Sequence, residues 1–323
     1  MATRLPDPPG PAVPHRAGGG DEADAIALLA RLLPAPPPGE VWLGDDAAVL
    51  RVPGQAGAHL LLAADALVAG LDADLSLTSL ADLGWKALAV NVSDIAAMGG
   101  TPLHAVVSVV GLGVAGLEEL YAGLLEASEE LGCPVVGGDL SGGAQAMVSV
   151  AVTGWCEGAP VLRSGARPGD VIWATGAFGA AAAGLRGLRS GTLPVASALA
   201  LAHARPRPGL AEGAVARATG ATAMVDVSDG LVADLGHIAD ASGVGYHLDE
   251  VPVAAGATME EALEGGDDYV LVFTAPEQAR PGTGFSEAGL PSPHRLGRCV
   301  EATRGRLLRG APVASEGWQH RLG

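Results

Sequence analysis

Six aspartates in this sequence each lie in a short segment rich in Gly, Ser or Asp that interrupts an apolar run. They are Asp46, Asp65, Asp94, Asp139, Asp226 and Asp229, in the segments GDDAAVL, LLAADALVAG, VNVSDIAAMGG, VVGGDLSGG and MVDVSDGL. Carboxylates at the ends of buried strands and helices are costly to desolvate unless a cation or hydrogen bonds compensate them. Several of them in one cleft would repel one another unless a divalent metal held them together. The pattern therefore predicts a hard-cation site that handles a phosphate.

A simpler interpretation is that each aspartate caps a helix or a turn. Asp229 would then be a helix N-cap, whereas Asp226, inside the end of a strand, is harder to explain in this way. Asp94 lies in the predicted last turn of a helix, where a carboxylate opposes the helix dipole and needs a compensating reason. Gly44 permits a tight turn that would direct Asp46 toward the end of a strand. As a set, the aspartates favour metal ligation over capping.

The basic residues narrow the chemistry further. Nineteen residues are Lys or Arg, and Lys86 is the one lysine, in the apolar helical stretch ADLGWKALAV. A phosphate-binding P-loop needs a lysine after its glycines, and no GxGxxG follows a predicted strand. No Ser-His-Asp or Cys-His arrangement is apparent, and His237 on an apolar helix face is interpreted as structural. Nucleotide phosphates would have to be neutralised by metal ions and a few arginines.

Composition sets the broad class. The 323 residues are 49% hydrophobic and 3% aromatic, enough for two domains with a core built from Ala, Val and Leu. The net charge of −17 argues against nucleic acid or an anionic membrane surface as the main partner. The longest nearly apolar stretch, Ala105 to Leu117, is too short to span a membrane. Cys133, Cys156 and Cys299 are isolated, so a cytoplasmic location is expected.

Strands and helices alternate along the chain, which predicts α/β domains. The Pro- and Gly-rich residues 1–20 predict a disordered tail, and a Gly- and Pro-rich seam predicts a boundary near residue 158. The predicted organisation is residues 1–20 as tail, 21–157 as the first domain and 158–323 as the second. The main predicted helices span Asp21–Leu33, Thr78–Met98, Leu117–Leu131, Leu231–Ala241 and Thr258–Leu263. The final forty residues are expected to be looser.

With these residues identified, the chain resembles the thiamine-monophosphate kinase family, part of the superfamily of aminoimidazole ribonucleotide synthetase. The resemblance runs from about Asp21 to Trp318. It rests on GDDAAVL, KALAVNVSDIAAMGGTP, GGD at 137–139, RSGARPGDVIWATG, VDVSDGLVADLGHIADASGVG, LEGGDDYVLVFT and GWQH. Several of these motifs in this order are specific, although any one alone would be weak.

The resemblance implies a two-domain fold whose N-terminal sheet pairs in a homodimer. It implies direct, in-line transfer of the ATP γ-phosphoryl group onto thiamine monophosphate, with several Mg²⁺ ions and no general base. The implied Mg²⁺ ligands are Asp46, Asp65, Asp94, Asp139, Asp226 and Asp229. The positions that match the ATP site are Tyr121, Gly138, Asp139, Arg163 and Ser228. Those that match the thiamine phosphate site are Asp72, Asp267 and Trp318.

The acceptor side departs from the family pattern. Ala64 stands where the family has Thr before the aspartate, and LVAGLDAD replaces LVEGxHF, so that Asp72 stands in place of a histidine. GGDLSGG and GGDDYVL also differ from the usual GGDTT and GGEDYEL. Two alternatives therefore remain: a paralogue that binds nucleotide and metal without turnover, and a related ATP-dependent ligase-type enzyme. The second would need a cysteine nucleophile near one terminus in its best-known branches, and the first cysteine here is Cys133.

Overall fold

The computed structural model describes residues 26, 31–52, 54–55 and 57–313 of the chain. The described residues from Pro36 onward belong to one compact unit. The predicted tail over residues 1–20 and the predicted acceptor residue Trp318 lie outside the described residues. Of the helix predicted over Asp21–Leu33, the residues described before Leu33 are all helical.

The first half of this unit contains a mixed five-stranded sheet with the strand order β1-β2-β5-β3-β4. Its strands are β1 (Ala48–Arg51), β2 (Ala58–Val68), β3 (Thr101–Val110), β4 (Val135–Ser141) and β5 (Met147–Glu157). All neighbours are antiparallel except β3 and β4. β2 pairs with β5 along its whole length, so the strand continues through Asp65 to Val68. Asp65 therefore lies inside β2 opposite Val150, and not at the end of a strand.

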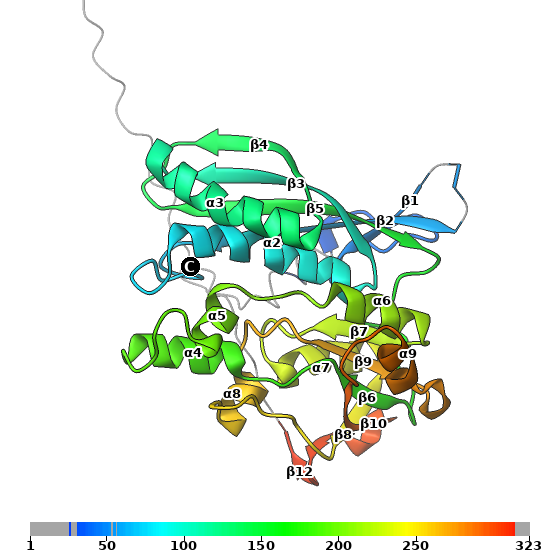
Figure 1. Cartoon of the computed structure of the whole chain (residues 1–323). Helices are drawn as coiled ribbons and strands as arrows, with labels where there is room; N and C mark the ends of the chain where they lie inside the picture. Colours follow the sequence, from blue (N-terminus) through cyan, green and yellow to red (C-terminus); the bar gives the residue numbers. More distant parts are fainter. Residues whose placement is uncertain (1–25, 27–30, 53, 56, 314–323) are drawn as a thin grey trace, which may run out of the picture. The chain divides into compact units, whose positions relative to one another are not determined.

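Two long helices, α2 (Leu80–Ala97) and α3 (Val114–Leu131), lie side by side over one face of this sheet (Figure 1). Ser79 is the N-cap of α2 and forms a capping box with Asp82. Glycines let the two helices approach closely. A Cβ atom on Gly123 would lie 1.8 Å from the Ala81 carbonyl oxygen, a distance that no side chain tolerates. Close packing buries most of α2, including its polar side chains.

The second half contains a seven-stranded sheet, again mostly antiparallel, with the order β12-β11-β8-β10-β6-β9-β7. Its strands are β6 (Val171–Ala174), β7 (Ala223–Asp226), β8 (Val244–Leu248), β9 (Leu271–Ala275), β10 (His294–Glu301), β11 (Arg306–Leu308) and β12 (Ala311–Pro312). β10 is internal, paired with both β8 and β6. The expectation of loose structure in this region is wrong, because Leu296, Cys299 and Val300 in the segment HRLGRCVE are buried strand residues.

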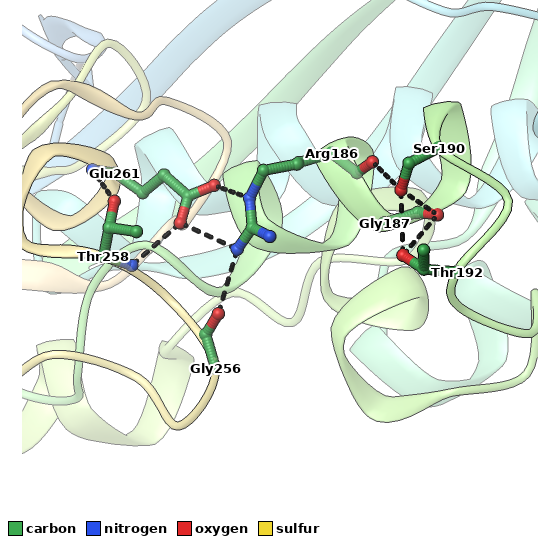
Figure 2. A network of polar contacts seen from close by, with 7 residues as sticks. All are labelled: Arg186, Gly187, Ser190, Thr192, Gly256, Thr258 and Glu261. Carbon is green, nitrogen blue, oxygen red and sulfur yellow. Dashed lines mark hydrogen bonds and ion pairs between the residues drawn. The ribbon is translucent and has the colours of Figure 1, made fainter.

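Short helices accompany this second sheet. They are α4 (Ala180–Arg189), α5 (Ala198–Ala204), α6 (Leu210–Ala218), α7 (Leu231–Ser242), α8 (Met259–Glu264) and α9 (Pro281–Glu287), with 3₁₀ turns η1 (Glu277–Ala279) and η2 (Ala302–Arg304). Figure 2 shows how α4 is tied to α8: the Arg186 guanidinium lies 2.6 Å from Glu261 and also donates to the Gly256 carbonyl. Glu261 completes a capping box with Thr258 at the start of α8. This network is structural and holds the segment that leads to Asp267.

The mixed α/β class with two sheets agrees with the sequence prediction. The boundary near residue 158 stays a prediction, in a chain where β5 ends at Glu157 and β6 begins at Val171. Among the described residues, no helix combines the length and the hydrophobicity that crossing a membrane requires.

Candidate active site

Three carboxylates from distant segments meet beside the end of α2. Asp46 lies in the bend before β1, Asp94 lies in the last turn of α2, and Asp226 ends β7. One oxygen atom of each lies within 4.8 Å of the others. Carboxylate oxygens at this spacing are the donors that a hard divalent cation prefers.

Arg163 is the cation beside this carboxylate cluster. Its Nη2 lies 2.5 Å from Oδ1 of Asp46, and its backbone N–H donates to Oδ2 of Asp45 at 3.0 Å. Gly44 has a φ of +106°, so the turn that sets up both aspartates uses a conformation that favours glycine. The second oxygen of Asp46 is buried and has no hydrogen-bond partner among the described residues. A buried carboxylate oxygen without a donor fits a cation ligand, so the residues present suit Mg²⁺.

Two polar residues of α2 orient the acids around the cluster. The Ser93 hydroxyl donates to Oδ2 of Asp226 at 2.5 Å. The Asn91 side chain accepts from the backbone N–H of Asp65 at 2.9 Å, which fixes β2 against the helix at this level. Asp65 itself is exposed. It lies close enough for its charge to act on Asp94.

The electrostatics of the cluster follow from burial and from like charges. Burial, opposed by Arg163 but reinforced by Asp226, raises the pKa of Asp46 to about 8. Burial and then the charges of Asp226, Asp65 and Asp46 raise the pKa of Asp94 well above its usual range. Burial also raises the pKa of Asp226, although Ser93 and Arg163 oppose the shift. A bound cation would favour the charged carboxylates and so lower these raised pKa values.

A second group lies at the start of α7, where ligand atoms of Asp229, Asp234 and His237 are within 4.8 Å of one another. The N-cap of α7 is Gly230, so Asp229 is not the simple helix cap that the capping interpretation requires. Oδ2 of Asp234 instead accepts from the backbone N–H groups of Asp229 and Gly230, at 3.0 and 3.1 Å. The loop that carries Ser228 is therefore held by a buried carboxylate.

The predicted acceptor residue Asp267 lies in a tight loop before β9. Its φ is +68°, and its backbone N–H donates to the Ser228 carbonyl at 2.8 Å. Its carboxylate is 2.7 Å from Nζ of Lys86. Lys86 and His203, together with the predicted acceptor residue Asp72, line one small pocket. Asp72 also accepts from the backbone N–H of Val68 at 2.8 Å.

The structure does not bring all the predicted residues together within one chain. Asp139 is exposed on β4 and pairs with Ser108 of β3. Three strand spacings, or about 14 Å, separate β4 from β2, the strand that carries Asp65. Gly138 lies beside it, where a Cβ atom would meet the Val107 carbonyl oxygen. Tyr121 is on α3 and packs against the hydrophobic core that α2, α3 and the first sheet share. Their membership of the site stays a prediction.

Sequence reasoning did not find Ser93, Asn91, Lys86, His203 or Asp234. Ser93 and Lys86 bond to partners 133 and 181 residues away, which no local pattern reveals. The one available signal was polar residues on an otherwise apolar helix, since Lys86, Asn91 and Ser93 all interrupt the buried face of α2.

The fold and the carboxylate cluster define a class of protein. Residues 44–156 match the family model for the AIR synthase related protein, N-terminal domain, and residues 167–309 match the model for its C-terminal domain. Thiamine-monophosphate kinase of Methanopyrus kandleri is 34% identical over 309 residues, 92% of this chain and 95% of the relative. The Escherichia coli K12 enzyme of that name is 38% identical over 259 residues, 75% of this chain and 78% of the relative. The chain belongs to the thiamine-monophosphate kinase family.

The fold of this chain also resembles that of a solved structure. "AaThiL complexed with AMPPCP and TMP" matches with a TM-score of 0.82 and 33% sequence identity. The match covers 93% of this chain and 97% of that one.

Proposed function

We propose that this chain transfers the γ-phosphoryl group of ATP to the phosphate of thiamine monophosphate, giving thiamine diphosphate and ADP. The observation that carries the proposal is the carboxylate cluster of Asp46, Asp94 and Asp226 with Arg163 beside it. It occurs in a chain 33% identical to a ThiL whose structure holds AMPPCP and TMP. Curated kinases of bacteria and archaea share the family.

In the proposed reaction, an oxygen of the acceptor phosphate forms a bond to the γ-phosphorus of ATP while the bond to the β,γ-bridging oxygen breaks. The acceptor is already anionic, so no general base is needed, and positioning with charge compensation supplies the catalysis. Mg²⁺ bound by the carboxylate cluster would neutralise charge on the transferred group. Arg163 adds a fixed cation beside it, and Ser93 keeps Asp226 oriented.

The further residue roles are part of the proposal. Asp65, Asp139 and Asp229 would complete the Mg²⁺ ligands. Tyr121, Gly138, Asp139, Arg163 and Ser228 would bind ATP. Asp72, Asp267 and Trp318 would bind thiamine monophosphate, with Trp318 as a stacking face. Asp139, Gly138 and Tyr121 lie away from the cluster, so their roles require a second copy of the chain or a movement within this one.

We propose a homodimer as well, formed through the face of the first sheet that α2 and α3 leave uncovered. Leu62 and Val106 point to that face and are 41% and 46% exposed. Apolar side chains at this exposure on one sheet face favour burial against a partner.

A cytoplasmic location is proposed from the substrate ATP and from three buried, unpaired cysteines.

The decisive experiment measures ADP and thiamine diphosphate together, with thiamine monophosphate, ATP and Mg²⁺ supplied. Equal amounts of the two products are expected, and Asp267→Ala should raise the KM for thiamine monophosphate far more than the KM for ATP. ADP without thiamine diphosphate would identify a different acceptor. Nucleotide binding without either product would identify a protein that binds without turnover.

A further inference from the structure

The carboxylate of Asp267 is held by residues that no motif pointed to. Nζ of Lys86 lies 2.7 Å from Oδ2 of Asp267, and Nδ1 of His203 lies 3.4 Å from the same oxygen. The Tyr269 hydroxyl donates to the other oxygen, Oδ1, at 3.3 Å. Three groups from α2, α5 and the loop itself therefore converge on one carboxylate.

Lys86 and His203 are buried, whereas the Asp267 carboxylate that they contact is partly exposed. The side chains of Lys86 and His203 are 5% and 7% exposed, whereas that of Asp267 is 32% exposed. A carboxylate oxygen accepts two hydrogen bonds, so Oδ1 keeps one acceptor position beyond the bond from Tyr269. Burial opposes ionisation, but Lys86 and His203 outweigh it and lower the pKa of Asp267 to about 2. Asp267 thus presents a fixed anionic acceptor to the open side.

α2 sets the distance from this carboxylate to the reacting centre. Lys86 and Ser93 are seven residues apart, so they lie on the same face of the helix, two turns or about 10 Å apart. Lys86 binds Asp267, and Ser93 binds Asp226 of the carboxylate cluster. One face of α2 therefore holds Asp267 and Asp226 at two separate points. This arrangement suits a molecule that has a phosphate at one end and a second group to be recognised at the other.

We propose that Lys86 and His203 are positioning residues for the acceptor's ring end: they hold Asp267 so that its free oxygen receives an N–H donor or a cationic heteroaromatic ring. This inference rests on the proposed function, because it takes the acceptor to be thiamine monophosphate. It assigns the ring end, and not the phosphate, to the Lys86–His203–Asp267 group. The competing explanation is that the Lys86–Asp267 ion pair only joins α2 to the loop before β9.

The test measures calorimetric dissociation constants for thiamine, thiamine monophosphate and AMPPCP on the full chain. Lys86→Met should weaken thiamine and thiamine monophosphate together, by about tenfold or more, and leave AMPPCP within twofold, since a charged hydrogen bond is worth about 1.5–3 kcal/mol. Lys86→Arg should recover part of the loss. Arg217→Met is the matched control: it removes a partly buried cationic contact to the Gly99 and Glu157 carbonyls and should leave all three constants unchanged.

Three outcomes would overturn the inference. Unchanged constants in Lys86→Met would show a purely structural ion pair. Weakening of thiamine monophosphate alone would place Lys86 on the phosphate. Equal weakening of all three ligands would show general disruption. If Lys86→Met does not fold, His203→Gln keeps the ion pair, and it should weaken both thiamine ligands about threefold. Turnover is not needed for these measurements, so a failed kinase assay would refute the proposed function without deciding this point.

Discussion

The fold shifts the pKa values of the Asp46 and Asp267 carboxylates in opposite directions. Burial and the neighbouring acid Asp226 raise the pKa of Asp46 to about 8 despite Arg163. Lys86 overcomes burial at Asp267 and lowers its pKa to about 2. The first group suits a ligand whose proton a metal displaces, and the second suits a permanent anion that orients a substrate.

The raised pKa of Asp46 predicts how the stability of the metal-free protein depends on pH. The folded state binds the proton more tightly than the unfolded state, so the free energy of unfolding should fall as pH rises from about 4 to about 8. The loss should be on the order of a few kcal/mol, because one pKa unit corresponds to about 1.4 kcal/mol. Asp267 has the opposite effect, but only below pH 4. Urea denaturation with EDTA across this range measures the slope.

The matching control is Asp46→Asn, which should make the slope shallower without abolishing it, because the pKa values of Asp94 and Asp226 are also raised. Mg²⁺ should stabilise the wild-type protein most at the upper end of the range, where its proton competitor is absent. A metal-free protein whose stability rises steadily from pH 5 to pH 8 would contradict the assignment of Asp46.

Asp94→Asn should reduce ATP turnover by two orders of magnitude or more, because it removes a carboxylate that the proposed function assigns to Mg²⁺ binding. The fold should survive. Asp94 lies among like charges. Its neutralisation should therefore keep or raise the melting temperature of the metal-free protein. Steady-state kinetics and thermal melting check the two parts. Turnover within tenfold of wild type would show that Asp94 is only a residue at the end of a helix, without a catalytic role.

Single residues also show where sequence reasoning stops. Asp94 could be singled out from the sequence, because a carboxylate against a helix dipole needs a compensating reason, and the structure places it beside Asp46 and Asp226. Its companion Ser93 could not be assigned, since its partner Asp226 lies 133 residues later in the chain. The same limit hid the role of Lys86. The sequence shows that it is the sole lysine but not that it reaches Asp267.

At the scale of elements, the contact between α2 and α3 depends on glycine. Gly123→Ala places a Cβ atom within 1.8 Å of the Ala81 carbonyl oxygen, so the helices must separate. We expect a loss of about 2–4 kcal/mol in the free energy of unfolding. Gly116→Ala on the same helix is the control, since its nearest neighbours are 3.4 Å away and alanine favours helix. It should be neutral or stabilising, and equal effects of the two substitutions in urea titrations would refute the packing argument.

The elements that the sequence predicts well are those whose signals are local. α2 has a cap, an apolar run and a glycine stop, and it spans nearly the predicted residues. The apolar run LLLAA ends at Ala64, but pairing with the eleven-residue strand β5 carries β2 on to Val68. β10 escaped notice because arginines and a bulge interrupt its apolar pattern, and its identity as a strand depends on its two neighbours.

At the scale of the whole molecule, the uncovered face of the first sheet predicts association. Ala64 of β2, Ala151 of β5 and Val106 of β3 lie side by side across this face. We expect sedimentation to show a dimer at micromolar concentration and Val106→Asp to shift it toward monomer, because a charge would be buried at the interface. Val195→Asp, at a residue 69% exposed in the second half, is the control and should not change the mass. A monomeric wild-type protein would exclude the dimer.

The burial of Lys86 also has a practical consequence for chemical labelling. The chain has one ε-amino group, and that residue is 4% exposed at the wall of the pocket. Acylating reagents should therefore react at the α-amino group well before they reach the side chain. Slow modification of Lys86, followed by peptide mass spectrometry, would then report how often this pocket opens. If a bound ligand slows the modification of Lys86 further, the rate of that modification would report whether the pocket is occupied.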